Sequence, residues 1–286
     1  MSSNKGTLSR KVFVHEVINP PYAGHSIDAK INVLNSKHLE ISDLKKDDGQ
    51  QSFTLKIIDP MSLGIQNFQE YNVEIFFDRI LLACNLVLKS AAFSRHKSDS
   101  SHTIVERENS QSSGTKITRT PEGIIIEVNE TLGITDSVHI TAGFEENLDE
   151  IQVLDIFKKL DRLVGTNKTN LQVGDIKKSL DEYSAGMSSF DRIGIFKHLY
   201  SSMELATNCD GNDRTGSRLD NEVNKIVRTP SLTVQNWREF NDRTKHINRN
   251  PQEEKWYQEN LSRLGEKLHP LRETCQKIIL GRLQNI

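Results

Sequence analysis

Hydrophobic and polar side chains alternate along two short segments near the start of the chain. Residues 11–17 alternate between the two sides of an extended backbone, and Pro20 and Pro21 follow them. Residues 52–58 form a second such run, which ends at Asp59-Pro60. Alternation of this kind is typical of half-buried strands, and proline ends them. We therefore predict strands over 11–17 and 52–58, with a loop over the polar residues 36–51.

Residues 65–93 carry apolar side chains on two helical stripes, which together are too wide for a helix that buries only one side. The stripes hold Phe68, Phe76, Ile80, Ala83 and Val87, and Phe77, Leu81, Cys84 and Leu88. We expect these side chains to form core and not a binding site. The pattern predicts a buried helix at the centre of the first domain.

The next segment, residues 95–116, is rich in Ser, His, Lys and Glu, which predicts an exposed loop. The apolar, β-branched runs at 124–128 and 138–142 predict two strands. Near residue 149 the apolar period changes to that of a helix, and further helices are predicted at 173–183, 189–207, 216–227, 232–247 and 252–283. The short connections favour antiparallel neighbours. The sequence thus predicts an α+β domain over 1–148 and an all-α antiparallel helical bundle over 149–286.

Composition narrows the possible functions. The 286 residues carry a net charge of −2, so we expect no duplex DNA binding, which normally goes with a basic domain. No apolar run reaches the about 20 residues that cross a bilayer, and the N-terminus lacks the apolar core of a signal peptide, so we expect a cytoplasmic protein that does not enter membranes. The three cysteines are far apart, which argues against a disulfide framework or a zinc site. We expect neither a metal nor a cofactor.

The strongest functional candidate is the segment from Arg228 to Arg249. It holds five cations and only two acids, Glu239 and Asp242, and His246 adds charge below neutral pH. The buried row of the predicted helix contains Trp237, which we expect to pack in the core and not to stack on a base. The candidate ligand-binding residues are Arg238, Asn241, Arg243, Lys245, His246 and Arg249.

Two helical segments carry a family resemblance. They contain Leu199-Tyr200-Ser201-Ser202-Met203-Glu204-Leu205-Ala206 and Asn241-Asp242-Arg243-Thr244-Lys245-His246. The pattern over about residues 150–286 resembles the HEPN superfamily of helical nucleotide- and RNA-associated domains. The resemblance implies a homodimer, and its active members cleave RNA without metal, with four to six residues between an arginine and a histidine.

In this chain the three positions that the family arginine would take before His246 hold Asn241, Phe240 and Glu239. If the protein is a nuclease, its catalytic residues are therefore His246 with Arg243 or Arg238, as base and as phosphate-stabilising cations. Three hypotheses follow. The first is a catalytically degenerate HEPN-like module that binds RNA, a nucleotide or a protein partner. The second is a metal-independent endoribonuclease of a defence or toxin type. The third is a self-associating scaffold.

Self-association is expected on a second ground. The predicted last helix, 252–283, has more apolar surface than one neighbouring helix covers. Its apolar residues are Trp256, Leu261, Leu264, Leu268, Leu271, Cys275, Ile278 and Ile279. Because two-fold dimers are the commonest soluble oligomers, we predict a homo-oligomer.

Overall fold

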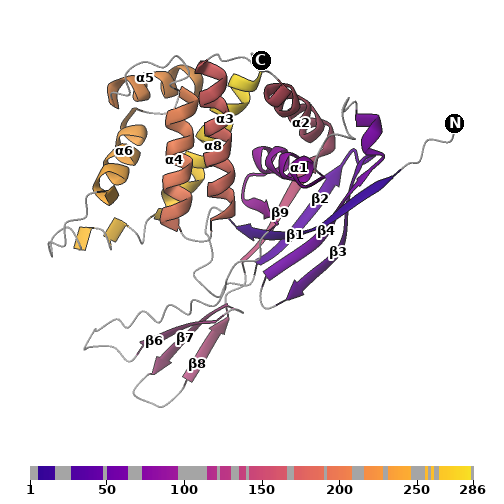
Figure 1. Cartoon of the computed structure of the whole chain (residues 1–286). Helices are drawn as coiled ribbons and strands as arrows, with labels where there is room; N and C mark the ends of the chain where they lie inside the picture. Colours follow the sequence, from indigo (N-terminus) through magenta and orange to yellow (C-terminus); the bar gives the residue numbers. More distant parts are fainter. Residues whose placement is uncertain are drawn as a thin grey trace. The chain divides into compact units, whose positions relative to one another are not determined.

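The computed structural model has a strand-rich N-terminal region followed by a mostly helical remainder (Figure 1). It divides into two compact units. Unit 1 comprises Met1–Phe68 and Ser90–Glu150, and unit 2 comprises Gln69–Lys89 and Ile151–Ile286. The structure describes residues 6–16, 27–47, 50–63, 73–95, 115–120, 123–129, 135–139, 142–165, 171–189, 192–207, 216–227, 231–245, 255–256, 259–260 and 264–284.

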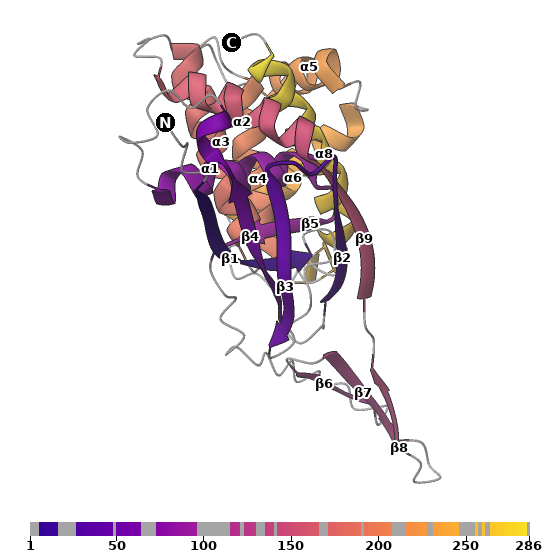
Figure 2. The same ribbon diagram turned by 90° about the vertical axis from the view of Figure 1, so that its right-hand side faces the viewer.

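Unit 1 contains a four-stranded antiparallel sheet with strand order β3-β4-β1-β5 (Figure 2). Its strands are β1 (Thr7–Glu16), β3 (Leu39–Asp47), β4 (Gln50–Ile58) and β5 (Ala91–Ser94). Alternate positions point to one face, so Val12, Val14, Phe53 and Phe93 are all buried. The rings of Phe53 and Phe93 meet edge to face with centroids 4.9 Å apart. This face forms the apolar core of the sheet.

The other strands of unit 1 form two smaller sheets. Strand β2 (Ile27–Leu34) pairs in parallel with β9 (Ala142–Asp149). Strands β6 (Thr115–Thr120), β7 (Gly123–Asn129) and β8 (Thr135–His139) form an antiparallel sheet. The short 3-10 helix η1 (Pro60–Leu63) follows β4.

The side-chain amide of Gln51 links β4 to β2. Its Nε2 donates to the carbonyl oxygen of Ala29 at 2.6 Å, and its Oε1 accepts from the Ala29 backbone nitrogen at 2.8 Å. Gln51 is only 3% exposed. A buried backbone group without a partner is costly, so this paired amide replaces two hydrogen bonds that a neighbouring strand would otherwise supply.

Two glutamates near the end of unit 1 hold backbone nitrogens. Glu150 is 3% exposed and accepts hydrogen bonds from the backbone nitrogens of Lys37, His38 and Leu39. Glu146 accepts from the backbone nitrogens of Ser90 and Ala91. Charge-assisted bonds of this type offset the cost of burying a carboxylate. They fix the loop before β3 and the start of β5.

Unit 2 consists of helices. They are α1 (Val73–Val87), α2 (Glu150–Gly165, of which Glu150 lies in unit 1), α3 (Leu171–Ser188), α4 (Arg192–Thr207), α5 (Gly216–Val227), α6 (Ser231–Lys245) and α8 (Leu264–Leu283). Helix α4 packs against both α3 and α8. The rings of Phe76 on α1 and Phe157 on α2 meet edge to face at 5.1 Å, and Arg79 pairs with Asp161 at 3.1 Å.

The carboxyl end of α1 is held by polar side chains of α3 and α8. The carbonyl oxygen of Asn85 accepts hydrogen bonds from Tyr183, Arg272 and Gln276 at 2.8, 3.2 and 3.0 Å. Arg272 also donates to the carbonyl oxygen of Lys89 at 2.9 Å. A cation at the carboxyl end of a helix complements the helix dipole and satisfies its last carbonyl groups.

Several sequence predictions are confirmed. Strands form over both alternating runs, and helices form at every position predicted between 173 and 245, within a few residues at each end. The stripes of the 65–93 segment are core: Phe76, Phe77, Ile80, Leu81, Ala83, Cys84 and Leu88 are buried. Phe68 lies outside the described residues. Trp237 is 1% exposed and belongs to the core, as expected.

Other predictions are wrong. Residues 39–47, predicted as loop, form strand β3, and residues 91–94, predicted as the end of a helix, form β5. Helix α1 belongs to unit 2 and not to the centre of the strand-rich part. The two predicted domains, 1–148 and 149–286, stay a prediction.

The last helix was expected to leave apolar side chains exposed for self-association, but the apolar side chains of α8 are buried within the single chain. Its residues Leu264, Leu268, Leu271, Cys275, Ile278 and Ile279 are each 0% exposed in the single chain. Leu261 lies outside the described residues. The homo-oligomer stays a prediction, and these side chains give it no surface. None of the described helices is both long enough and apolar enough to cross a bilayer.

Candidate functional site

Helix α6 divides its residues between a buried row and an exposed face. Val234, Trp237, Phe240, Asn241 and Thr244 are buried, at a spacing of three and four residues. The opposite face carries the charged residues of the segment predicted as a ligand site. Because Asn241 is only 3% exposed, its side chain is on the buried row and not beside the exposed cations.

Arg238 is held by an acid from another helix. Its Nη1 lies 3.5 Å from Oδ2 of Asp220 on α5, and its side chain is 29% exposed. The second oxygen of Asp220, Oδ1, is buried and has no hydrogen-bond partner among the described residues. Asp220 therefore neutralises Arg238, although Asp220 lies outside the segment from Arg228 to Arg249.

Arg243 is more open and has two partners. Its Nη2 lies 2.8 Å from Oε1 of Glu239, one helical turn earlier, and the two side chains are 51% and 52% exposed. The guanidinium carbon Cζ also lies 4.6 Å from the centroid of the Trp256 ring. An exposed ion pair and an exposed cation–π contact each contribute only about 0–1 kcal/mol. Arg243 is thus ordered by contacts that an anion can displace.

An aromatic row connects Trp256 to the core. The row consists of Phe196 on α4, Phe240 on α6 and Trp256. Phe196 and Phe240 lie 4.7 Å apart between centroids, edge to face, and Phe240 and Trp256 lie 5.9 Å apart. The backbone carbonyl of Trp256 accepts a hydrogen bond from Nδ2 of Asn260 at 2.9 Å. The partly exposed Trp256 ring is therefore supported by buried rings behind it.

The pKa of Tyr200 shows which charged side chains lie near the exposed face of α6. Burial raises the pKa of its hydroxyl well above the ordinary value, and the nearby carboxylates of Glu204, Asp242 and Asp220 raise it further, while Arg238 lowers it. The hydroxyl stays protonated across the physiological range. Two of these acids, Glu204 and Asp220, come from α4 and α5. The excess of cations on the face is therefore smaller than the sequence segment predicts.

The remaining predicted site residues are not placed by the structure. Lys245 is the last residue of α6, and its side chain is not described. His246 and Arg249 lie outside the described residues. The arginine–histidine arrangement expected of an active nuclease therefore stays a prediction.

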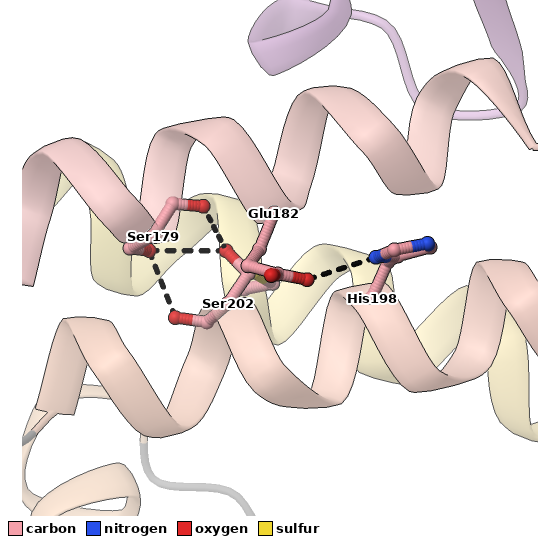
Figure 3. A network of polar contacts seen from close by, with 5 residues as sticks. Ser179, Glu182, His198 and Ser202 are labelled. Atoms are coloured by element: carbon pink, nitrogen blue, oxygen red, sulfur yellow. Dashed lines mark hydrogen bonds and ion pairs between the residues drawn. The ribbon is translucent and has the colours of Figure 1, made fainter.

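A second polar cluster joins α3 to α4 (Figure 3). Oγ of Ser179 donates to the carbonyl oxygen of Ser202 at 2.8 Å, and Oγ of Ser202 donates to that of Ser179 at 2.7 Å. The same pair of helices is joined by Nδ1 of His198 and Oε2 of Glu182, 2.8 Å apart. In Figure 3 the imidazole faces Glu182, and no dashed line joins it to either serine. A serine nucleophile needs its hydroxyl against a base, so this cluster is a helix contact and not a catalytic triad.

Sequence patterns give no signal for these partners. Asp220, Trp256, Glu182 and His198 stand on different elements from the residues they contact, and no motif connects them. Among the described residues, no group of three or more His, Cys, Asp or Glu is arranged to hold a metal ion. No protein-family model, curated protein or solved structure matches the chain.

Proposed function

We propose that the helical part of this chain is a HEPN-like binding module without nuclease activity, and that the exposed face of α6 recognises a phosphate-bearing ligand, RNA or a nucleotide. One observation carries this proposal. Arg243 presents a half-exposed guanidinium that is paired with Glu239 and lies over the ring of Trp256. One guanidinium group can donate two parallel hydrogen bonds to two phosphate oxygens, and it can stack on an aromatic ring. Both properties suit RNA and nucleotides as ligands.

The packing of unit 2 supports the fold part of the proposal. Helices α3 and α4 are joined by residues 189–191, a connection short enough to favour antiparallel neighbours, and α4 packs against α8 as well as α3. We propose that these helices form the antiparallel bundle implied by the HEPN resemblance.

The residues at the family's arginine positions favour binding over cleavage. RNA cleavage of the HEPN kind needs an arginine at a set spacing from the histidine to stabilise charge on the reacting phosphate. Arg243 lies too close to His246 in the sequence and Arg238 too far from it, and Arg238 also faces Asp220. The positions where the family carries its arginine hold Glu239, Phe240 and Asn241. A nuclease that uses His246 is the alternative, and a self-associating scaffold is the third.

The test is binding of a labelled, short single-stranded RNA, followed by fluorescence anisotropy at several salt concentrations. Neutralising Arg243 as Arg243→Gln should weaken binding and lower the salt slope by roughly one unit, because one phosphate contact is lost. Lys277→Gln is the matched control, since Lys277 forms an exposed ion pair with Glu273, also one turn apart, on α8. The control should bind as the wild type does.

Two outcomes would overturn the proposal. Binding that shows no dependence on salt, or that falls equally in both variants, would leave the scaffold hypothesis. Cleavage of the RNA in the presence of chelator, abolished by His246→Ala, would establish the nuclease instead.

A further inference from the structure

We infer that the α6 face binds one nucleotide unit in two parts, in which the nucleobase stacks on Trp256 and the adjacent phosphate pairs with Arg243 in place of Glu239. This inference rests on the proposed function and names the ligand chemistry of the same site. The ligand is a nucleobase joined to a ribose phosphate, either a free nucleotide or a unit of single-stranded RNA.

The first step of the argument concerns Trp256. Trp256 is half-buried as a residue, while Phe240, whose ring lies 5.9 Å from its ring, is 1% exposed and packs edge to face on Phe196. A ring held in this way is ordered before a ligand arrives, so stacking on it costs little conformational entropy. Aromatic side chains bind bases by stacking because every base offers a flat face.

The second step concerns what covers Trp256 now. The planar guanidinium of Arg243 lies over the ring, with Cζ 4.6 Å from the ring centroid. A flat cation in this place occupies the position that a stacked base would take. Arg243 is half exposed, and Glu239, its ion-pair partner, is equally open to water, so neither contact holds the guanidinium strongly. Arg243 can therefore swing from the ring to a phosphate while a base takes its place.

The third step concerns selectivity. Inorganic phosphate gains only the contact with Arg243, whereas a nucleotide gains that contact and the stack on Trp256. Glu239 pairs with Arg243, Asp220 pairs with Arg238, and Asp242 precedes Arg243 in the sequence, and these acids disfavour a ligand that brings many phosphates at once. A duplex also hides the faces of its bases. The face therefore fits a single unpaired nucleotide unit.

The experiment follows the emission of Trp256 in Trp237→Phe protein, where it is the remaining tryptophan. Adenosine monophosphate and a short single-stranded oligoadenylate should quench this emission in a saturable way, and ribose 5-phosphate, which has no base, should not. An oligoadenylate that binds more than ten times more tightly than the mononucleotide identifies RNA as the natural source, and equal affinities identify a free nucleotide.

Variants separate the two halves of the site. Trp256→Leu should abolish the preference for adenosine monophosphate over ribose 5-phosphate and keep the salt-sensitive binding that depends on Arg243, while Trp256→Phe should keep the preference. Glu239→Gln should bind several times more tightly at low salt, and Glu273→Gln, from the matched pair on α8, should be unchanged. Circular dichroism checks that each variant is folded.

The failures are distinguishable. Salt-sensitive RNA binding without quenching of Trp256 by any base would overturn this inference and leave the proposed function in place. Absence of any salt-sensitive binding would overturn both. If Trp256→Leu does not fold, the quenching of Trp256 in Trp237→Phe protein decides: quenching by adenosine monophosphate but not by ribose 5-phosphate supports the stack, and equal responses to both overturn it.

Discussion

Arg272 is buried at 1% exposure and donates from Nη2 to the carbonyl oxygen of Asn85, 3.2 Å away. Arg272→Met should remove this donor and the bond to Lys89, while Tyr183 and Gln276 still donate to the carbonyl oxygen of Asn85. We expect a loss of about 2–4 kcal/mol in unfolding free energy, because a hydrogen bond to a charged group contributes about 1.5–3 kcal/mol. Urea unfolding measures this loss.

The control is Lys277→Met, at an exposed position of α8, which should change the unfolding free energy by less than about 0.5 kcal/mol. Equal losses in Arg272→Met and Lys277→Met would contradict a stabilising role for Arg272.

Gln51 should be sensitive to the loss of a single donor. Gln51→Glu keeps the shape of the side chain but places an acceptor against the carbonyl oxygen of Ala29. We expect a loss of about 2 kcal/mol or more, since a buried acceptor pair replaces a hydrogen bond. Hydrogen exchange at the Ala29 amide should accelerate more than exchange at the amides of α4. Unchanged protection at Ala29 would show that the side chain does not complete the pairing.

The buried thiols predict how stability changes in alkali. Burial raises the pKa of Cys84 and of Cys275 from 9.0 to about 12. Both thiols stay neutral in the folded state while those of the unfolded chain ionise, so their contribution is complete below pH 9 and is lost as pH rises from 9 towards 12. Replacing Cys84 with alanine should make the fall in unfolding free energy shallower over this window, by at most about 1.4 kcal/mol per pH unit. An identical slope in both proteins would contradict the assignment.

The same burial predicts slow thiol chemistry. In a Cys209→Ser background, a thiol reagent at pH 8 should label Cys84 and Cys275 only after urea is added, because the thiolate is the reactive form. Rapid labelling of the folded protein would show that these side chains are accessible.

Asp220 predicts a gain of affinity. Asp220→Asn removes the carboxylate that faces Arg238 and one of the acids near Tyr200. The salt-sensitive binding of single-stranded RNA should become several times tighter at low ionic strength, where electrostatic contacts are least screened. Asp155→Asn, which breaks an exposed ion pair with Lys159 on α2, is the control. Equal affinities of wild type and Asp220→Asn would show that Arg238 takes no part in binding.

Sequence patterns predicted the elements whose apolar period is strong. Phe76 and Phe77 stand on stripes that only a buried helix explains, and Trp237 stands on the buried row of α6. Strand β5 was missed because all of its residues are buried, and a short apolar run has no period that distinguishes strand from helix. Strand β3 was missed because it is a polar edge strand, with an irregular register between Ser42 and Lys45.

The candidate site was predictable only in part. The cations of α6 are adjacent in sequence, so their clustering follows from helical geometry alone. Glu239 precedes Arg243 by one turn of the same helix, but two other partners are distant: Asp220 comes from α5, and Trp256 follows α6 after an intervening segment. Whether a cation is free or paired depends on packing between helices, which local periodicity does not encode.

The hydrogen bond from Arg272 to Asn85 joins α1, at the start of unit 2, to α8, at its end. The two bonded residues are 187 positions apart, and the buried side chains of α1 are synthesised long before α8. A nascent chain that stops before α8 leaves the carboxyl end of α1 without its cation, and long-range closure of this kind is slow. A C-terminal truncation that removes α8 therefore removes a hydrogen bond at residue 85. On such an unfinished chain the apolar stripes of α1 lack the side chains of α8 and would be the surface for a chaperone to bind.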